Sequence, residues 1–296
     1  MSAPTLLLGV LGSPIAHSAS PAMQQAGLAA MGIDATYLPF EVQPEQLPAA
    51  LEGLSALGAL GANLTAPLKE AAARHLSRLE PTAARLGAVN TLVRAPQGRG
   101  RTGAAAGFVG HNTDLPAFEA ALAPLLATDR PRRALVFGAG GTAATSLVAL
   151  ARCGFEEIVL LARTPERGQD LADRLQAADL LEKVSLEIGA SGDHPAPAQV
   201  VVNATPLGRS GDRPAVPRRH LREARLVVDW VYRPGGTALI AAAAERGIAT
   251  VDGAELLFAQ GVRALALWAG REPGPKVERA MRRALHRWLE SGPRSD

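Results

Sequence analysis

The strongest constraint on the fold is a glycine-rich turn between an apolar strand and a helix. Arg133 to Phe137 is predicted to be a buried strand, and Gly138-Ala139-Gly140-Gly141-Thr142-Ala143 opens a helix that runs to Cys153. Glycines here allow a tight turn and let a pyrophosphate approach the N–H groups of the helix N-terminus. Because the pattern is Gly-x-Gly-Gly-x-Ala rather than the full Gly-x-Gly-x-x-Gly, close packing alone is the alternative. The segment predicts a parallel α/β sheet that binds a dinucleotide.

The residues after the next predicted strand, Glu157 to Leu161, indicate which dinucleotide binds. NAD sites favour a carboxylate at this point for the ribose hydroxyl, whereas NADP sites favour arginine for the 2′-phosphate. Arg163 and Arg167 flank the turn, and Glu166 is the only acid nearby. We therefore expect NADP rather than NAD.

Two further apolar runs, Val200 to Val202 and Leu226 to Val228, are predicted strands of the same sheet. The first leads into Asn203-Ala204-Thr205-Pro206 and the second into Asp229-Trp230-Val231-Tyr232. Residues at the carboxyl ends of parallel strands line the crevice of an open α/β sheet, so we expect these segments to lie near a ligand. A helix from Thr237 to Arg246 is predicted to follow.

A second candidate site lies earlier, in the segment Gly61-Ala62-Asn63-Leu64-Thr65-Ala66-Pro67-Leu68-Lys69-Glu70. Thr65 is a predicted N-cap, and Pro67 lies near the first position of the helix that follows. Lys69 would then lie in the first helical turn, where the helix dipole disfavours a cation by roughly 0.3–1 kcal/mol. Such a lysine can act as a general base near neutral pH, and a solvated lysine on a helix face is the alternative.

Other polar residues in this half of the chain add to the candidate site. Ser18 and Ser20 precede a helix-start signal, and two hydroxyls at a helix N-terminus suit a carboxylate; the alternative is that Ser20 only caps the helix. Asn90 lies in an apolar strand predicted over Gly87 to Val93, where either backbone or a ligand must satisfy its amide. Asp114 is either the N-cap of the next helix, predicted from Ala117 to Leu126, or a site residue.

Composition excludes several classes of protein. The 296 residues allow two domains, and 47% hydrophobic with 20% charged residues is typical of a globular protein. Cys153 is the single cysteine, which excludes an intramolecular disulfide, and we expect a small buried residue rather than a nucleophile. Because the N-terminus lacks a signal peptide's basic region and no apolar run reaches roughly 18 residues, we expect a cytoplasmic protein without membrane spans. The net charge of +3, without a basic and aromatic stripe, argues against nucleic-acid binding.

Taken in order along the chain, these motifs resemble those of the shikimate dehydrogenase family. The resemblance spans nearly the whole chain and rests on Gly12 to Pro21, Asn63 to Lys69, Gly87 to Val93, Asn112-Thr113-Asp114, Gly138 to Ala143, Asn203 to Gly208 and Ala259-Gln260-Gly261. It implies an NADP-dependent oxidoreductase acting on a CH–OH group, which reversibly reduces 3-dehydroshikimate to shikimate in aromatic amino-acid biosynthesis.

The resemblance also implies roles for individual residues. Lys69 and Asp114 would form the catalytic acid–base pair, and Ser18 and Ser20 would hold the substrate carboxylate. The other expected substrate contacts are Thr65, Asn90, Tyr232 and Gln260. The expected cofactor contacts are Gly138, Gly140, Gly141, Thr142, Ala143, Arg163, Thr164, Arg167, Thr205 and Gly253. No metal is expected, because the sequence lacks zinc-ligand spacing.

We therefore predict a two-domain α/β fold, with the active-site cleft between a substrate-binding domain and a Rossmann-like NADP-binding domain. Residues 1–113, completed by C-terminal helices over 253–296, would bind the substrate, and residues 114–252 would bind the cofactor. Pro96 to Gly107 is a predicted loop in a segment longer than is typical of the family, and Thr128 to Pro131 is a predicted linker. We expect a monomer or a homodimer.

Several alternatives remain open. The chain has Gln24-Gln25 where the family often has His-Asn, and Ala162-Arg163-Thr164 where it usually has Asn-Arg-Thr. Such changes would fit a quinate/shikimate or aminoshikimate dehydrogenase that also uses NAD, although two serines at the carboxylate favour shikimate. A folate-linked methylene dehydrogenase shares the broad architecture but gives no reason for Ser18 and Ser20. A non-catalytic NADP-binding sensor would bind the cofactor without turnover.

Overall fold

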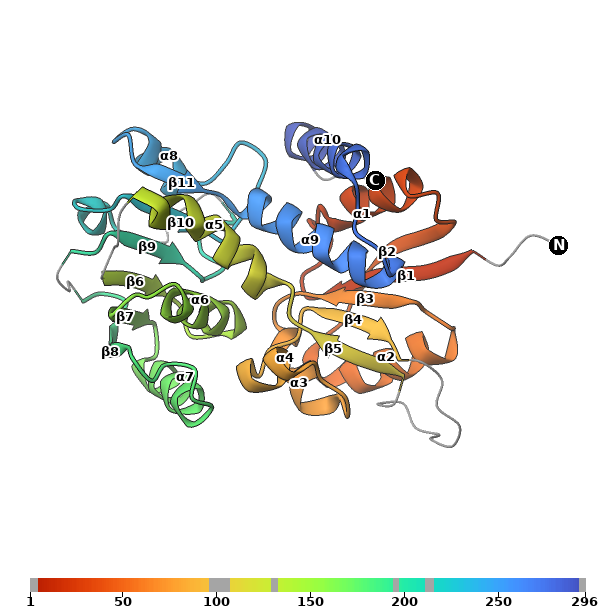
Figure 1. The fold of residues 1–296 in the computed structure, drawn as a ribbon, viewed down its shortest axis with the longest axis horizontal. Helices are drawn as coiled ribbons and strands as arrows, with labels where there is room; N and C mark the ends of the chain where they lie inside the picture. The colour runs from red at the N-terminus through yellow and green to blue at the C-terminus, as the bar shows by residue number, and fades with distance from the viewer. Residues whose placement is uncertain (1–4, 96–106, 129–132, 194–196, 211–215, 293–296) are drawn as a thin grey trace. The chain divides into compact units, whose positions relative to one another are not determined.

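The chain folds into two compact units, residues 1–113 with 258–296 and residues 114–257 (Figure 1). The computed structural model describes residues 5–95, 107–128, 133–193, 197–210 and 216–292. Most of the predicted loop from Pro96 and most of the predicted linker from Thr128 lie outside the described residues. No helix in the described ranges is both long and apolar enough to span a bilayer.

The first unit, residues 1–113 with 258–296, is built on a five-stranded sheet of order β2-β1-β3-β4-β5. β1 pairs in parallel with β2 and β3, whereas β4 is antiparallel to both β3 and β5. The strands are β1 (Leu6–Gly12), β2 (Ala35–Glu41), β3 (Gly61–Leu64), β4 (Thr91–Arg94) and β5 (Phe108–His111). Parallel neighbours need a crossover connection, which helices supply between β1 and β2 and between β2 and β3.

Helices cover both faces of this sheet (Figure 1). One group consists of the 3₁₀ helix η1 (Pro44–Gln46), α2 (Leu47–Ala56), α3 (Leu68–His75) and α4 (Pro81–Leu86). The other consists of α1 (Ser20–Ala30), the part of α9 (Gly253–Ala269) from Phe258 onward, and α10 (Pro275–Ser291). A side chain on Gly27 would place Cβ 2.7 Å from Leu265 Cδ2 and 2.9 Å from Met281 Cγ, so glycine lets α1 approach α9 and α10 closely.

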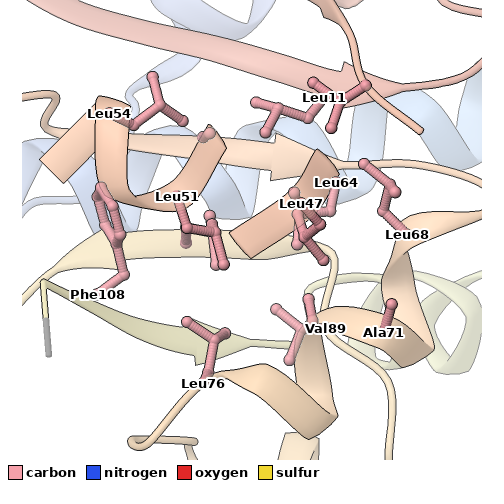
Figure 2. Close-up of a cluster of buried hydrophobic side chains, with 14 of the residues drawn as sticks. Leu11, Leu47, Leu51, Leu54, Leu64, Leu68, Ala71, Leu76, Val89 and Phe108 are labelled. Atoms are coloured by element: carbon pink, nitrogen blue, oxygen red, sulfur yellow. The ribbon is translucent and has the colours of Figure 1, made fainter. Parts of the chain in front are cut away.

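The main core of the first unit lies between the sheet and α2 and α3 (Figure 2). Leu47, Leu51 and Leu54 recur at helical spacing along α2 and are all buried. They face Leu64 of β3 and Phe108 of β5, both of which are buried as well. Each such side chain contributes roughly 1.5–3 kcal/mol by leaving water, so this layer fixes the strands that carry the polar residues of the other face.

Apolar residues recur at helical spacing along α10 and pack into the core of the first unit. Val277, Met281 and Leu285 are buried along α10, and Trp288 and Leu289 are partly buried. The Arg282 guanidinium lies 4.0 Å from the centroid of the Phe258 ring, a cation–π contact between α10 and α9.

The second unit, residues 114–257, is a six-stranded parallel sheet of order β11-β10-β9-β6-β7-β8. Its strands are β6 (Arg133–Phe137), β7 (Glu157–Ala162), β8 (Ser185–Ala190), β9 (Val200–Asn203), β10 (Leu226–Asp229) and β11 (Ala249–Val251). Its helices are α5 (Asp114–Thr128), α6 (Gly141–Arg152), α7 (Pro165–Ala177), the 3₁₀ helix η3 (Arg218–Leu221) and α8 (Ala238–Ala244). The strand order reverses between β6 and β9, which is the switch point of a Rossmann-type sheet. The predicted α/β class is confirmed.

Three expectations for local structure need correction. The strand predicted from Gly87 begins only at Thr91, because Gly87 has a φ of 64° and ends α4. Cys153 ends α6 and is partly rather than fully buried. The helix predicted from Ala117 already begins at Asp114.

Candidate functional site

Lys69 lies in the first turn of α3, as predicted, and is half-buried. The predicted N-cap at Thr65 is wrong, because the cap position is Pro67 and no side chain caps the helix. Thr65 instead belongs to a tight turn: its carbonyl accepts a hydrogen bond from Leu68 N at 2.9 Å. Its own N–H donates to the carbonyl of Leu11 in β1, which extends the pairing of β3 by one residue.

Ser18 and Ser20 lie at the start of α1. Ser18 Oγ accepts a hydrogen bond from Ser20 N at 3.3 Å, and the Ser20 side chain is buried. The N-cap position is Ala19 and Ser20 is the first helical residue, so the alternative that Ser20 merely caps the helix is wrong. Both hydroxyls thus lie within one residue of a helix N-terminus, which suits an anion.

Glu41 at the end of β2 holds the segment that leads into these serines. Its carboxylate accepts hydrogen bonds from the Ser13 hydroxyl and from Ile15 N, the latter at 2.8 Å. These two donors, the Ser13 hydroxyl first, lower the pKa of Glu41. The segment before Ser18 is therefore tied to the sheet edge by a charged acceptor.

Asn90 and Gln260 belong to a buried cluster of amides and hydroxyls. Asn90 Oδ1 accepts from Thr113 N at 2.7 Å, and Asn90 Nδ2 donates to Thr113 Oγ1 at 2.9 Å. Gln260 Oε1 lies 3.5 Å from Asn90 Nδ2 and 3.4 Å from Thr113 Oγ1. The backbone therefore satisfies part of the Asn90 amide, as buried polar groups require.

The cluster continues across the sheet. Asn63 Nδ2 donates to Thr91 Oγ1 at 3.1 Å, and Asn63 Oδ1 accepts from the Tyr37 hydroxyl at 2.7 Å. Thr91 Oγ1 in turn lies 3.0 Å from Thr113 Oγ1. All of these side chains are buried, so each holds its neighbour in one orientation.

Backbone hydrogen bonds bring Lys69, Thr65 and Asn90 of the first unit together. The Lys69 carbonyl accepts from Val89 N at 2.9 Å, one residue before Asn90. Leu64 N donates to the Asn90 carbonyl at 2.8 Å, one residue before Thr65. Asp114, which is buried and follows Thr113 directly, and Tyr232, which is half-buried, both belong to residues 114–257.

The glycine turn of the second unit is shaped for close approach of a ligand. Gly138 has a φ of 119°, and a Cβ there would lie 2.9 Å from the Ala204 carbonyl oxygen. Gly140 is the extended N-cap of α6, and a Cβ built on it meets no atom within 4 Å. Gly141, Thr142 and Ala143 form the first turn of α6, whose N–H groups have no partner inside the helix.

The other candidate cofactor residues are dispersed around the carboxyl ends of the strands. Arg163 and Thr164 follow β7, Arg167 lies in the first turn of α7, and all are exposed. Thr205 follows β9, and its Oγ1 donates to Asn203 Oδ1 at 2.7 Å. Gly253 begins α9, and a Cβ there would lie 2.6 Å from the Trp230 carbonyl oxygen, so only glycine allows this contact.

Asp229 is a buried carboxylate that the sequence marks only as the end of a strand. It accepts from Asn203 Nδ2 at 2.8 Å, from Val231 N at 3.0 Å and from Thr237 Oγ1 at 2.6 Å. Burial raises its pKa, although these three donors oppose the shift.

Burial also raises the pKa of the Cys153 thiol to about 11, which disfavours the nucleophilic thiolate.

A parallel sheet with a switch point, an open N-cap glycine and arginines after the second strand defines a dinucleotide-binding protein of the Rossmann class. Residues 10–92 match the family profile described as the shikimate dehydrogenase substrate binding domain. The chain belongs to the shikimate dehydrogenase family, as its sequence motifs predicted.

Two relatives illustrate the similarity in sequence. One from Moorella thermoacetica is 39% identical over 291 residues, covering 96% of this chain and 95% of the relative. Another from Rubrobacter xylanophilus is 41% identical over 287 residues, covering 95% of each chain. Both are named shikimate dehydrogenase (NADP(+)).

A solved structure shows the same fold. The shikimate 5-dehydrogenase of Thermus thermophilus, in complex with NADP(H) and shikimate, superposes with a TM-score of 0.76 at 34% identity. The match covers 94% of this chain and 99% of that one.

Proposed function

We propose that this protein is a shikimate dehydrogenase that interconverts 3-dehydroshikimate and shikimate with NADP. The observation that carries the proposal is the buried cluster containing Asn90 and Gln260, beside the backbone of Lys69, in the unit that contains the matched substrate-binding segment. The names of the relatives, and the ligands of the Thermus thermophilus structure, support the same substrate and cofactor.

The residues of the second unit fit a bound NADP. Gly140 leaves open space beside the N-terminus of α6, which is where a pyrophosphate would need to approach the backbone. Within the described part of the chain the Arg163 guanidinium is exposed and forms no ion pair, so it is available to a 2′-phosphate. The residues that would hold the cofactor are Gly138, Gly140, Gly141, Thr142, Ala143, Arg163, Thr164, Arg167, Thr205 and Gly253. The nicotinamide, when bound, takes or gives the hydride.

Lys69 supplies the proton transfer in this proposal. When shikimate is oxidised, the hydroxyl on the reacting carbon must lose its proton as hydride leaves that carbon. Lys69 Nζ takes this proton and returns it in the reverse direction, with Asp114 as its partner. A positioned base of this kind contributes about 10²–10⁴-fold to the rate.

The remaining residues bind and orient the substrate. Ser18 and Ser20, at the N-terminus of α1, hold the carboxylate, which the helix end favours. Thr65, Asn90, Tyr232 and Gln260 hold the ring hydroxyls. Residues 1–113 with 253–296 would accordingly act as the substrate-binding domain and residues 114–252 as the NADP-binding domain.

Spectrophotometry of NADPH formation tests this function. Shikimate with NADP+ is expected to give the highest kcat/KM, with lower values for quinate and for NAD+. Comparable turnover of quinate, or of NAD+, would instead identify a quinate/shikimate dehydrogenase. Cofactor binding without turnover of either compound would contradict the proposal and favour an NADP-binding sensor.

We further propose that the protein is cytoplasmic and acts as a monomer or a homodimer. The single cysteine supports a reducing compartment. Light scattering coupled to gel filtration tests the assembly state, and a mass of three chains or more would contradict it.

A further inference from the structure

Gln24 is a fully buried glutamine on α1, and no part of the proposed function uses it. It lies four residues after Ser20, so the two side chains occupy the same face of the helix, one turn apart. Gln24 Nε2 donates a hydrogen bond to the Gly261 carbonyl oxygen of α9 at 3.0 Å. Gln24 thus lies one helical turn from Ser20, which is proposed to bind the substrate, and is hydrogen-bonded to Gly261, the residue after Gln260, which is also proposed to bind it.

The orientation of the Gln24 amide follows from its partner. A carbonyl oxygen can only accept a hydrogen bond, so the NH₂ group must face Gly261 and the amide oxygen must face away from it. Gln24 Oε1 is buried and has no hydrogen-bond partner in the part of the chain that the structure describes. Buried acceptors in proteins are nearly always satisfied, so this oxygen calls for a donor from outside the described residues, either a water molecule or a bound ligand.

The close approach of α1 and α9 is built into the sequence. A Cβ on Gly261 would collide with Met23 Cε and would lie 3.1 Å from Gln24 Nε2. Glycine at this position therefore lets the Gln24 amide reach the α9 backbone beside Gln260. Gln260 Oε1 lies 3.5 Å from Asn90 Nδ2, so the residue that precedes the hydrogen-bond acceptor of Gln24 belongs to the buried amide cluster.

The adjacent Gln25 shows that an unsatisfied amide is not a general feature of this helix. Gln25 Nε2 donates to the Ala35 carbonyl at 2.8 Å, and Gln25 Oε1 accepts from Tyr37 N at 3.0 Å. Both ends of this amide are used to fasten α1 to β2. Gln25 is therefore a structural glutamine and a matched control for Gln24.

We propose that Gln24 is a further substrate-binding residue, whose Oε1 accepts a hydrogen bond from a hydroxyl of bound shikimate. The inference rests on the proposed function, because Ser20 and Gln260 define the substrate region only if that function holds. Gln24 then contributes to specificity for a hydroxylated ring carboxylate, since a ligand without a hydroxyl at this point leaves the oxygen unsatisfied.

The test compares the KM values of wild type, Gln24→Met, Gln24→Leu and Gln25→Met for shikimate and for NADP+. Methionine matches glutamine in length and lacks a strong acceptor. The leucine variant shows whether an effect seen with methionine comes from the packing of methionine itself, because leucine packs differently and also lacks an acceptor. Both Gln24 variants are expected to raise the KM for shikimate about tenfold, the equivalent of one lost hydrogen bond. Their KM for NADP+ is expected to stay near wild type, and their melting temperature without ligand is expected to fall, as in Gln25→Met, because the hydrogen bond to Gly261 is lost. Gln25→Met is expected to lower the melting temperature and to keep the shikimate KM within about twofold.

Three results would overturn the inference. A shikimate KM within twofold of wild type in both Gln24 variants would mean that ordered water, not substrate, donates a hydrogen bond to Gln24 Oε1. A lowered melting temperature with an unchanged shikimate KM would assign Gln24 a purely structural role. An equal rise of the shikimate KM in Gln25→Met would show that displacement of α1 accounts for the effect. Failure of the wild type to oxidise shikimate at all would instead refute the proposed function, and this inference with it.

Discussion

The two units present polar groups to their proposed ligands in different ways. In the first unit, side-chain amides and hydroxyls form a continuous buried cluster from Tyr37 through Asn63 and Thr113 to Gln260. In the second, the groups proposed to bind the pyrophosphate are backbone N–H groups beside Gly140. A ring with several hydroxyls needs donors and acceptors at fixed positions, whereas a pyrophosphate needs open space and a helix end.

The largest expected effect concerns the chemistry of the first unit. Lys69→Met is expected to lower kcat by about 10²–10⁴-fold, because it removes the proposed proton acceptor. The KM for NADP+ is expected to change little. Lys276→Met is the matched control, since Lys276 is also the second residue of its helix but is exposed on α10. A kcat near wild type in Lys69→Met would remove lysine from the mechanism.

The buried carboxylate of the second unit gives the next largest effect, on stability. Asp229→Ala leaves three buried donors without their acceptor and is expected to lower the free energy of unfolding by about 2–4 kcal/mol. Asp229→Asn keeps one acceptor oxygen and should lower it by less. Urea unfolding measures both, and equal stability of the alanine variant and wild type would contradict the role of Asp229.

The pH dependence of Asp229 sharpens this prediction. Its pKa is raised in the folded state, so the folded protein binds this proton more tightly than the unfolded chain. The contribution of this proton to the free energy of unfolding is complete below the pKa that Asp229 has in the unfolded chain. It is lost as pH rises through the pKa that Asp229 has in the folded protein. The stability of Asp229→Asn relative to wild type should therefore improve as pH rises through the acidic range. A relative stability that falls over this range would contradict the direction of the shift.

Gly140→Val tests the backbone site of the second unit. The space beside Gly140 is open, so valine should leave the melting temperature nearly unchanged. It should raise the KM for NADP+ about 30-fold by blocking the hydrogen bonds of phosphate to the backbone. Gly274→Val is the matched control, because Gly274 is the extended N-cap of α10 and is equally open. Unchanged NADP affinity in Gly140→Val would place the pyrophosphate elsewhere.

Arg163 separates the two dinucleotides. Arg163→Ala is expected to weaken the binding of NADP+ about tenfold, because a charge-assisted contact with the 2′-phosphate is lost. NAD+, which lacks this phosphate, serves as the internal control and should be affected much less. An equal loss of affinity for both dinucleotides would mean that another residue selects NADP+ over NAD+.

Thr113→Val is expected to have the smallest effect. It removes the hydroxyl that contacts Asn90, Thr91 and Gln260 but keeps the backbone N–H that donates to Asn90 Oδ1. Because the Asn90 amide is then less firmly held, the KM for shikimate should rise about three- to fivefold, the equivalent of one neutral hydrogen bond. An unchanged KM would mean that the buried cluster does not orient Asn90.

The elements predictable from the sequence were those with strong apolar runs. β6, β9 and β10 are central and buried, so their hydrophobic residues mark them clearly. In the second unit the strands that the sequence did not predict were β8 and β11, which are the two edges of its sheet. Edge strands face solvent on one side, so their residues carry a weaker apolar pattern.

The candidate site was predictable where local motifs carry it, as at Lys69, Asn90 and Gly140. The hydrogen bond of Gln24 was not predictable, because it joins residues 237 positions apart in the sequence. The same holds for Asp229, whose donors come from β9, from the residues after β10 and from the N-cap of α8. Contacts of this kind depend on how helices and strands pack, which local sequence patterns do not encode.

The central claim is that side chains, most of them in the first unit, recognise the alcohol, and that the backbone at the start of α6 holds the pyrophosphate of the dinucleotide. The most direct test measures both KM values, for shikimate and for NADP+, in Gly140→Val and Thr113→Val under identical conditions. The account predicts that Gly140→Val raises only the value for NADP+ and that Thr113→Val raises only the value for shikimate. If either variant raised both values equally, the division between the two units would be wrong.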